Sequence, residues 1–325
     1  MKKYILCFIL SVCAAGIASN VTAAEFSPWY YKNGELADKD CAGKISARIM
    51  MKDFDADKKY SFFLAAYNSD GRLNSVMLKN ASGSSSMEIP AVENNSAGTA
   101  KTFVWDENMQ PIKNGGRFYA ETFDNDETGT IPSYNQWRIT ASDNTRAIVT
   151  CDPQNRENKV LKLEDNSASG KIGAVYSLPK QADGVYSVSW RMYCERLEEF
   201  EKGYADAGMT WVHARTASNS TIMSMSMSDS DSGIGYVYTK SASGEKASSA
   251  LTTVNEWHDM AMVYCNESEV KFYVDGRYIC SDKPITSDGM SMLSIFTTNS
   301  RVNSLYIDDI VVNYDDIPQY EEINE

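Results

Sequence analysis

The sequence predicts an all-β protein, with a small β-sandwich followed by a larger antiparallel sandwich. Residues 256–264 and 269–278 alternate apolar and polar side chains. The second run turns at Asp275-Gly276, which favours a tight hairpin because both turn positions need positive φ. Met223 to Ser228 alternates Met with Ser, which indicates a strand with one apolar face. The run from Leu305 to Val312 is typical of a buried closing strand.

The length of 325 residues favours two domains, and Lys113 to Gly116 is the expected linker. Residues 1–24 predict a secretory signal peptide, because a basic start, a short apolar run and small residues follow one another. A lipoprotein signal at Cys13 is the alternative, although Val12 stands where such a signal prefers a small residue. We therefore expect a secreted or cell-surface protein without a membrane span, ending in an acidic tail over residues 315–325.

The charge balance is acidic, with 31 basic and 44 acidic residues and a net charge of −13. Removing Lys2 and Lys3 with the signal leaves 29 against 44, or −15. This balance argues against a nucleic-acid partner, because phosphates need a basic surface. It also argues weakly against a polyanionic sugar, although a local basic cleft would override the net charge.

Seven cysteines include two in the signal, which leaves Cys41, Cys151, Cys194, Cys265 and Cys280. An odd number without close spacing does not predict a disulfide framework, and buried free thiols are expected. Cys265 and Cys280 are expected on the two strands that flank the one around Lys271. With two histidines in the chain, a structural zinc site is not expected.

The first domain, residues 25–113, consists of short runs of strand character separated by polar turns. Met87 to Pro90 is expected at a sheet edge, because proline cannot donate a ladder hydrogen bond. Leu64 to Tyr67, Phe103 to Asp106 and Met109 to Pro111 resemble the immunoglobulin or fibronectin type III-like modules of secreted clostridial-type polysaccharide-associated proteins. The resemblance implies a spacer or adhesion unit.

The second domain, residues 117–314, resembles a concanavalin A-like (laminin-G-like) jelly roll. The resemblance lies in the order of its alternating strands and in its closing Tyr-x-Asp-Asp run at Tyr306 to Asp309. Such jelly rolls usually bind sugars or proteins, and some are enzymes. The resemblance therefore implies a secreted, non-catalytic carbohydrate-binding or cell-surface adhesion protein whose partner is a polysaccharide or cell-surface glycan. Protein–protein adhesion through the sandwich loops is an alternative.

Aromatic and polar side chains on shared strand faces give the candidate ligand-binding residues. Trp211, His213 and Arg215 repeat every two residues and so lie on one face, as do Tyr236 and Tyr238. Aromatic rings stack on sugar rings while neighbouring polar groups take the hydroxyls. Trp211, Tyr236 and Tyr238 are expected to be the exposed rings.

A divergent polysaccharide lyase is the enzymatic alternative. Jelly-roll alginate lyases use His and Tyr for proton transfer and Arg and Gln to neutralise the uronate, which would assign His213, Tyr273 and Arg191 here. Trp211 stands where that family has Gln, and no Arg-x-Glu-x-Arg run exists. Paired acids in the laminarinase-type Glu-x-Asp-x-x-Glu spacing are also missing from the predicted strands, so glycoside hydrolysis is not expected.

The resemblance to carbohydrate-binding jelly rolls also implies a structural Ca²⁺ between the first and last strands. Ca²⁺ binds hard oxygen ligands. The acidic residues at these two places are Glu121, Asp124, Asp126, Asp308 and Asp309.

Overall fold

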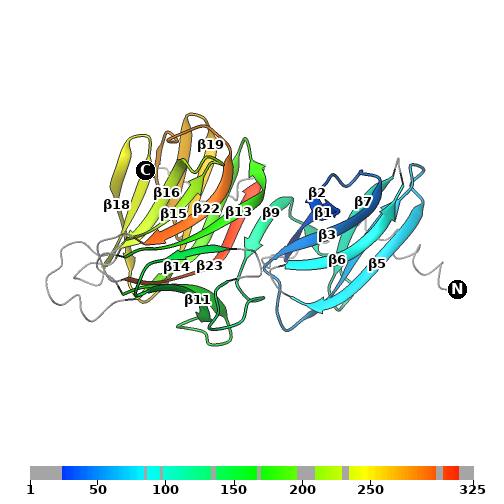
Figure 1. Ribbon diagram of the computed structural model, residues 1–325, viewed down its shortest axis with the longest axis horizontal. Coiled ribbons are helices and arrows are strands. Elements are labelled where there is room, and N and C mark those ends of the chain that lie inside the picture. The colour runs from blue at the N-terminus through cyan, green and yellow to red at the C-terminus, as the bar shows by residue number, and fades with distance from the viewer. Residues whose placement is uncertain are drawn as a thin grey trace. The chain divides into compact units, whose positions relative to one another are not determined.

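The computed structural model describes residues 24–83, 86–95, 98–132, 137–166, 170–195, 209–228, 234–297 and 303–314. The chain divides into two compact units between Gly115 and Gly116, inside the expected linker. The described residues form strands and turns and no helix, which confirms the all-β class (Figure 1). The predicted signal peptide and the acidic tail lie outside the described residues, apart from Ala24. No described helix is long and apolar enough to cross a membrane.

The first unit contains two sheets. The larger has the order β2-β1-β3-β6, with β8 also paired to β1, and the smaller has the order β5-β4-β7. Their bounds are β1 (Glu25–Lys32), β2 (Glu35–Leu36), β3 (Gly43–Lys52), β4 (Lys59–Tyr67), β5 (Leu73–Ser82), β6 (Ser86–Asn94), β7 (Thr99–Trp105) and β8 (Lys113–Asn114).

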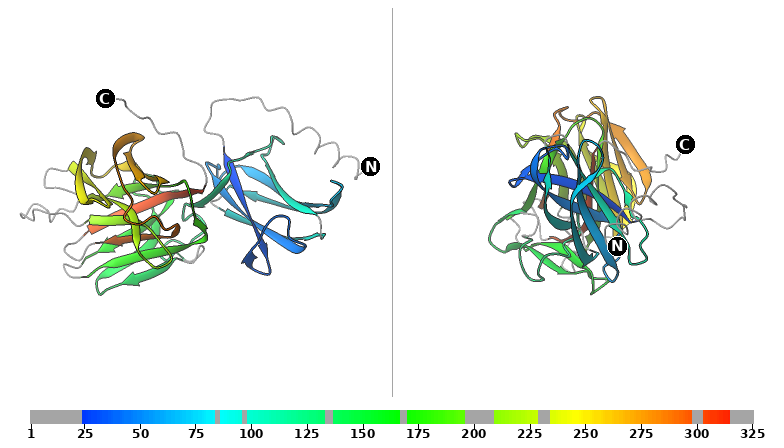
Figure 2. Two further views of the ribbon diagram at one scale, coloured as in Figure 1. Left: turned by 90° about the horizontal axis from the view of Figure 1, so that it is seen from above. Right: turned by 90° about the vertical axis from the view of Figure 1, so that its right-hand side faces the viewer.

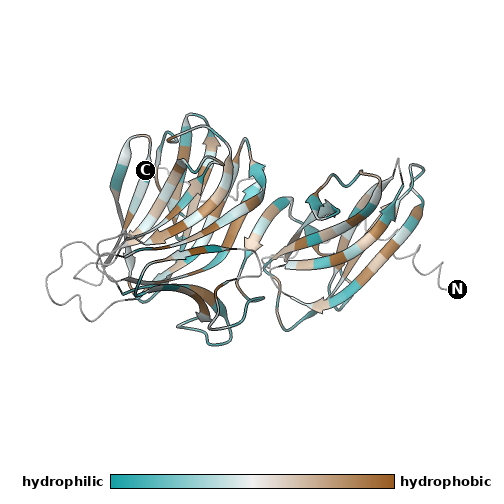
Figure 3. Ribbon diagram, in the orientation of Figure 1, coloured by the Kyte–Doolittle hydropathy of each residue, from teal (hydrophilic) through white to brown (hydrophobic). Residues whose placement is uncertain are grey.

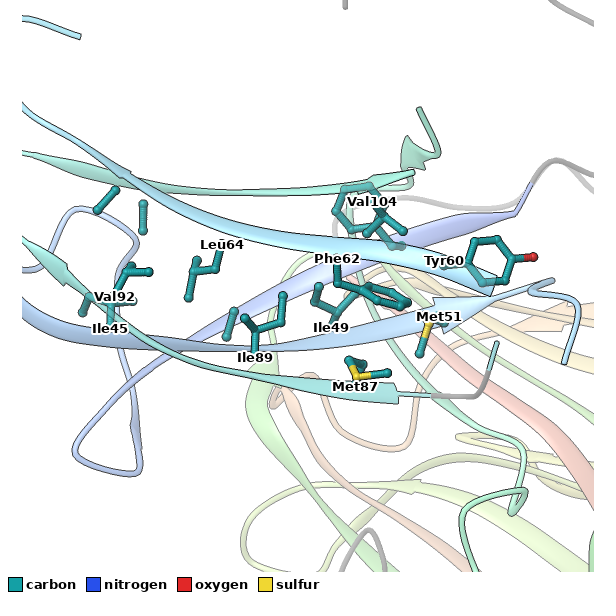
Figure 4. Packing of buried hydrophobic residues seen from close by; sticks show 14 residues of the cluster. Ile45, Ile49, Met51, Tyr60, Phe62, Leu64, Met87, Ile89, Val92 and Val104 are labelled. Carbon is teal, nitrogen blue, oxygen red and sulfur yellow. The ribbon is translucent and has the colours of Figure 1, made fainter. Parts of the chain in front are cut away.

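The core of this unit lies between β3 and β6 on one side and β4 and β7 on the other. Ile45, Ile49 and Met51 alternate along β3 and pack with Phe62 and Leu64 of β4 (Figure 4). This packing follows from the strand period of two, which turns every second side chain inward.

Pro90 lies in β6, which pairs with β3 alone and is therefore an edge strand, as the sequence predicted. The register shifts between Ile45 and Ala47, opposite Pro90. A bulge at this point accommodates a residue that lacks an N–H donor.

The second unit is a sandwich of two antiparallel sheets. The seven-stranded sheet has the order β10-β13-β22-β15-β16-β17-β18, and Figure 1 labels five of these strands in this sequence. The eight-stranded sheet has the order β11-β12-β23-β14-β19-β20-β21, with β9 also paired to β23. Figure 2 shows the strands from two further directions. The bounds are β9 (Arg117–Glu121), β10 (Arg138–Ala141), β11 (Thr145–Cys151), β12 (Lys159–Asp165), β13 (Ile172–Ala182), β14 (Tyr186–Cys194), β15 (Met209–Arg215), β16 (Thr221–Ser228), β17 (Ile234–Ser241), β18 (Gly244–Thr253), β19 (Trp257–Asn266), β20 (Glu269–Val274), β21 (Arg277–Asp282), β22 (Met290–Thr297) and β23 (Asn303–Tyr314).

Contacts across the sandwich identify the inner faces of its two sheets. Tyr176 of β13 stacks on Tyr119 of β9 with ring centroids 4.3 Å apart, and Thr239 of β17 lies 3.7 Å from the Cys280 sulfur of β21. The inner face of β16 is therefore its methionine face, because Met225 pairs with Thr239. The alternation of polar and apolar colours along the strands in Figure 3 reflects the same division.

Two local expectations for this unit are confirmed. Asp275 and Gly276 have φ of 51° and 75° and connect β20 to β21 as a tight hairpin. Cys265 and Cys280 lie on β19 and β21, on either side of β20. The expectation that all five thiols are buried is wrong for Cys151, which is exposed, while Cys194 is buried and all five are free.

Replacing Phe62 by Ala tests the core of the first unit. Phe62 is fully buried, so its truncation leaves a cavity and is expected to destabilise the unit by about 3–5 kcal/mol. Leu78→Ala is the control, because Leu78 is 51% exposed and its truncation is expected to change stability by less than about 0.5 kcal/mol. Urea unfolding of the full chain measures both. Equal losses in the two variants would contradict this packing.

Candidate functional site

The outer face of the seven-stranded sheet, on the side away from the eight-stranded sheet, carries the candidate ligand residues. Cross-strand pairing aligns them in two rows that run across the strands. The polar row consists of Arg138, Val175, Ser294, His213, Ser224 and Lys240. The aromatic row consists of Phe296, Trp211, Ser226 and Tyr238. Paired residues of antiparallel strands point to the same side, so each row lies on a single face.

The rings of the two rows contact one another. His213 lies near-parallel to Trp211 at a centroid distance of 6.0 Å and meets Phe296 edge-on at 5.8 Å. The Arg215 guanidinium carbon lies 4.8 Å from the centroid of Phe296, within the range of a cation–π contact. Phe296 in turn covers Gly173, where an added Cβ would approach the ring to 2.5 Å. Glycine at 173 therefore lets Phe296 lie flat on the sheet.

The centre of this face holds buried polar atoms without hydrogen-bond partners. They are the hydroxyls of Ser224, Ser226 and Ser294, Nδ1 of His213 and Nε of Arg215. A buried hydroxyl or ring nitrogen without a partner costs about 1–3 kcal/mol, and native proteins contain few such groups. Here five of them gather on one face of three adjacent strands, β22, β15 and β16.

His213 is uncharged at neutral pH. Burial first, and the nearby charges of Arg215 and Lys240 second, lower its pKa to about 3. His213 lies between Ser294 and Ser224, its partners on the neighbouring strands. A neutral imidazole offers one donor and one acceptor, and so suits the hydroxyl groups of a ligand.

The structure places the five predicted ligand residues on two nearby strands, with one correction. Trp211, His213 and Arg215 share the outer face of β15, and Tyr238 lies in the same face on β17. Trp211 is 7% exposed, so it is buried and is not the open ring that its sequence suggested. The backbone of Tyr236 lies in β17, and its side chain falls outside the described residues.

Phe296 and the three serines are site residues that sequence reasoning missed. Phe296 and Ser294 are on β22, which is distant in sequence from β15 but pairs with it in space. The Met-Ser alternation of β16 did carry a signal for Ser224 and Ser226. Once the methionines face the core, the serines must face outward.

The residues of the lyase alternative do not come together. His213 lies on the seven-stranded sheet, whereas Arg191 and Tyr273 lie on β14 and β20 of the eight-stranded sheet. Arg191 pairs with Asp309 at 3.3 Å and stacks on Trp257, and Tyr273 packs with Ala261 and Val263. The lyase assignment of these three residues therefore does not fit the fold. The other histidine, His258, is held by Asp275 at 2.9 Å in a structural contact.

Glu121 does not fit the calcium set. It is fully buried, and its two carboxylate oxygens accept hydrogen bonds from the Phe123 amide at 2.9 Å and the Trp137 indole at 3.0 Å. The carboxylate therefore acts as a buried anchor for the chain that follows β9.

The Lys159 ammonium group donates to backbone oxygens that could otherwise coordinate a metal ion. Lys159 Nζ donates to the carbonyl oxygens of Asp124 and Asp126, at 2.9 and 2.8 Å. Asp308 is buried and accepts from Asn158 at 2.8 Å. Burial first, and the Asp309 charge second, raise the pKa of Asp308. Within the described residues no group of three or more acidic, His or Cys side chains is placed to hold a metal ion. Glu121 and the loop around Asp124 and Asp126 therefore have internal partners, and the Ca²⁺ site stays a prediction.

Comparison with known proteins identifies no family for this chain. No protein-family model and no curated protein matches it. Solved structures that are similar in part include the globular domain of T. cruzi calreticulin (11% identity, 61% of this chain, 88% of that chain, TM-score 0.42). A carbohydrate esterase from the Shiga toxin-encoding bacteriophage phi24B is 17% identical over 55% of this chain and 90% of that chain, with a TM-score of 0.42. The botulinum neurotoxin type G receptor-binding domain is 12% identical over 61% of this chain and 48% of that chain, with a TM-score of 0.39. All three TM-scores lie below 0.5, and such likenesses carry no argument about the ligand.

The depressed pKa of His213 predicts a contribution to acid sensitivity. Between about pH 6.5, the pKa of an unfolded histidine, and pH 3, the unfolded state binds a proton that the folded state excludes. Stability is therefore complete above pH 6.5 and falls with pH in this window, by up to about 1.4 kcal/mol per pH unit. His213→Gln is expected to flatten this part of the profile, measured by denaturant unfolding at pH 7, 6, 5 and 4. Parallel profiles for the variant and the unaltered chain would contradict the burial of a neutral His213.

Lys159 already binds the carbonyl oxygens of the loop around Asp124 and Asp126, so we expect calcium to leave the protein's stability unchanged. Neither millimolar Ca²⁺ nor a chelator is expected to shift the thermal midpoint, because binding to the native state alone would raise it. Lys159→Ala is expected to lower the midpoint, since two loop carbonyls lose a charged donor. A rise of the midpoint with Ca²⁺ in the unaltered chain would restore the acidic residues as metal ligands.

Proposed function

We propose that the outer face of the seven-stranded sheet binds a carbohydrate chain, and that the protein is an exported, non-catalytic glycan-binding protein. The observation that carries this proposal is the line of unpartnered polar atoms in the polar row, directly beside the aromatic row. A sugar ring presents apolar C–H faces and hydroxyl edges together. Two parallel rows of rings and polar groups match both features.

The direction of the rows sets the direction of the ligand. Neighbouring strands are about 4.8 Å apart, so the three central members of the polar row repeat at roughly this interval across β22, β15 and β16. A chain laid across the strands meets Ser294, His213 and Ser224 in turn. The same chain runs beside Phe296, Trp211 and Tyr238.

Access to these atoms requires side chains to move. The serine hydroxyls and His213 Nδ1 are buried, with Arg215 and Lys240 close to His213. Arg and Lys are long and flexible, and we propose that their movement uncovers the floor of the face without any change in the backbone. Binding then exchanges unpartnered atoms for hydrogen-bonded ones, which is where the affinity would come from.

The non-catalytic part of the proposal rests on the surroundings of His213. Its neighbours are Trp211, Phe296 and two serines, and these suit a histidine that positions a ligand. Export rests on the signal-like residues 1–24. Retention of a cell-surface or environmental polysaccharide is the role that joins these two features.

Serine-to-alanine variants separate binding from folding. The Ser224 and Ser294 hydroxyls have no partner in the free protein, so Ser224→Ala with Ser294→Ala is expected to leave stability unchanged or slightly raised. The same double variant is expected to weaken glycan binding about tenfold, through two lost hydrogen bonds. Thermal unfolding measures stability. A glycan array followed by calorimetry on the glycans that bind measures affinity.

Tyr278→Ala is the control for surface aromatics, because Tyr278 is partly exposed on β21 of the other sheet. It is expected to retain full binding. A double serine variant that binds as well as the unaltered chain would overturn the proposed face, and so would a protein that binds no glycan on the array. Release of unsaturated uronates from any bound polysaccharide would overturn the non-catalytic assignment.

A further inference from the structure

Three basic side chains on the outer face of the seven-stranded sheet have no carboxylate partner. Arg138 and Lys240 stand at the two ends of the polar row, and Arg215 lies beside its centre on β15. In the described part of the chain none of the three forms an ion pair. They contact neutral groups instead. Arg138 Nη2 lies 3.9 Å from the Met292 sulfur, and Arg215 Nη1 donates to Asn219 at 2.8 Å.

Some other basic residues of the same unit do have a carboxylate partner. Arg191 pairs with Asp309 at 3.3 Å, Lys246 pairs with Asp282 at 3.2 Å, and Arg146 pairs with Glu164. Acidic residues outnumber basic ones, 44 to 31, so partners are abundant along the sequence. Three unneutralised cations on one face of such a chain are therefore a local reversal of its overall charge.

One of the three basic side chains, Arg215, lies in an environment that is unfavourable for its charge. Arg215 is about half buried, its Nε has no hydrogen-bond partner, and burial lowers its pKa. Its charge and that of Lys240 add to the effect of burial, which keeps His213 neutral. A half-buried guanidinium with an unpartnered nitrogen is expected where an anion completes its hydrogen bonds on binding.

We propose that the ligand of this face is an anionic glycan, a chain of sugars that carries carboxylate or sulfate groups. This inference rests on the proposed carbohydrate binding and adds the charge of the ligand. Arg138 on β10 and Lys240 on β17 are five strand spacings apart, about 24 Å along the row. A chain of several sugar units covers this distance, with one charged group near each end and another at Arg215.

The neutral centre of the row fits the same ligand. Ser294, His213 and Ser224 offer hydroxyls and an uncharged imidazole to the sugar hydroxyls, while the cations take the charged groups. Arg binds a carboxylate or sulfate through two parallel hydrogen bonds, which a neutral hydroxyl cannot match. Glu245 on β18 lies opposite Lys240 and is exposed beyond the end of the polar row, and no ion pair joins the two described side chains.

Pairs of polymers that differ in charge alone test this inference. Dextran is compared with dextran sulfate, and hydroxyethyl cellulose with carboxymethyl cellulose, by affinity electrophoresis and calorimetry on the full exported chain. We expect at least about tenfold tighter binding of one or both charged members, weakening with salt because screening shortens the reach of charges. The two pairs distinguish sulfate from carboxylate.

Matched variants test whether Arg138 and Lys240 cause the preference for charged polymers. Arg138→Ala with Lys240→Ala is expected to remove the preference for the charged member. The charge-keeping pair Arg138→Lys with Lys240→Arg is expected to retain most of it. Arg277→Ala with Lys283→Ala changes net charge equally at exposed positions outside this face and is expected to leave the preference intact.

Three outcomes would contradict one or both of the proposals. Equal binding of charged and neutral members, lost in the double serine variant, would overturn the anionic ligand and leave carbohydrate binding standing. A preference that falls equally in the Arg138/Lys240 and Arg277/Lys283 variants would show general charge attraction and overturn the site. Failure to bind any charged or neutral glycan would overturn both proposals together.

Discussion

The outer face of the seven-stranded sheet depends on one constraint, the burial of the methionine face of β16. Met223, Met225 and Met227 are fully buried between the two sheets, and burial of a side chain of this size contributes about 1.5–3 kcal/mol. Because strand side chains alternate, this burial turns Ser224 and Ser226 outward, and pairing places them beside His213 and Trp211. A slip of one residue would move every methionine to the wrong face. The register that stabilises the core is therefore also the register that builds the two rows.

The polar groups of the two rows lower the stability of the fold, and packing of the core does not require them. Alanine at 224, 226 and 294 would fit the same register without leaving hydroxyls unpartnered. Arg215 adds a charge where burial opposes it and lowers its pKa. Some buried polar groups elsewhere in the unit are satisfied, as when Asp165 accepts from Thr297 at 2.6 Å, while single atoms of Tyr186 and Trp190 also lack a partner. The outer face differs in that five such atoms lie together on three adjacent strands, which is expected where a ligand completes them, since proteins keep destabilising side chains mainly where function needs them.

Sequence periodicity was sufficient for the class of fold and for much of its detail. It predicted the hairpin at Asp275-Gly276, the edge position of Pro90 and the placement of Cys265 and Cys280. It also grouped Trp211, His213 and Arg215, because residues two apart share a face wherever the strand lies. It could not show which strands are neighbours, and so it missed Phe296 and Ser294 and assigned Arg191 and Tyr273 to the wrong side of the sandwich. The contacts around the predicted calcium residues were hidden for a similar reason. Nothing in the spacing of Asp124 and Asp126 reveals that Lys159, on a later strand, donates to their carbonyls.

Net charge was the least informative of the sequence properties for this site. A net charge of −13 predicts long-range repulsion of an anionic polymer, but the ions of physiological solution screen exposed charges beyond about 8 Å. A ligand lying along the polar row would be within contact distance of Arg138, Arg215 and Lys240, whereas acids such as Asp309, paired with Arg191, belong to the other sheet. The distant charge then mainly slows approach, and the local charge sets the affinity once the ligand has arrived. An acidic protein can therefore hold an acidic glycan, provided that the cations of the binding face are left unpaired, as these three are among the residues that the structure describes.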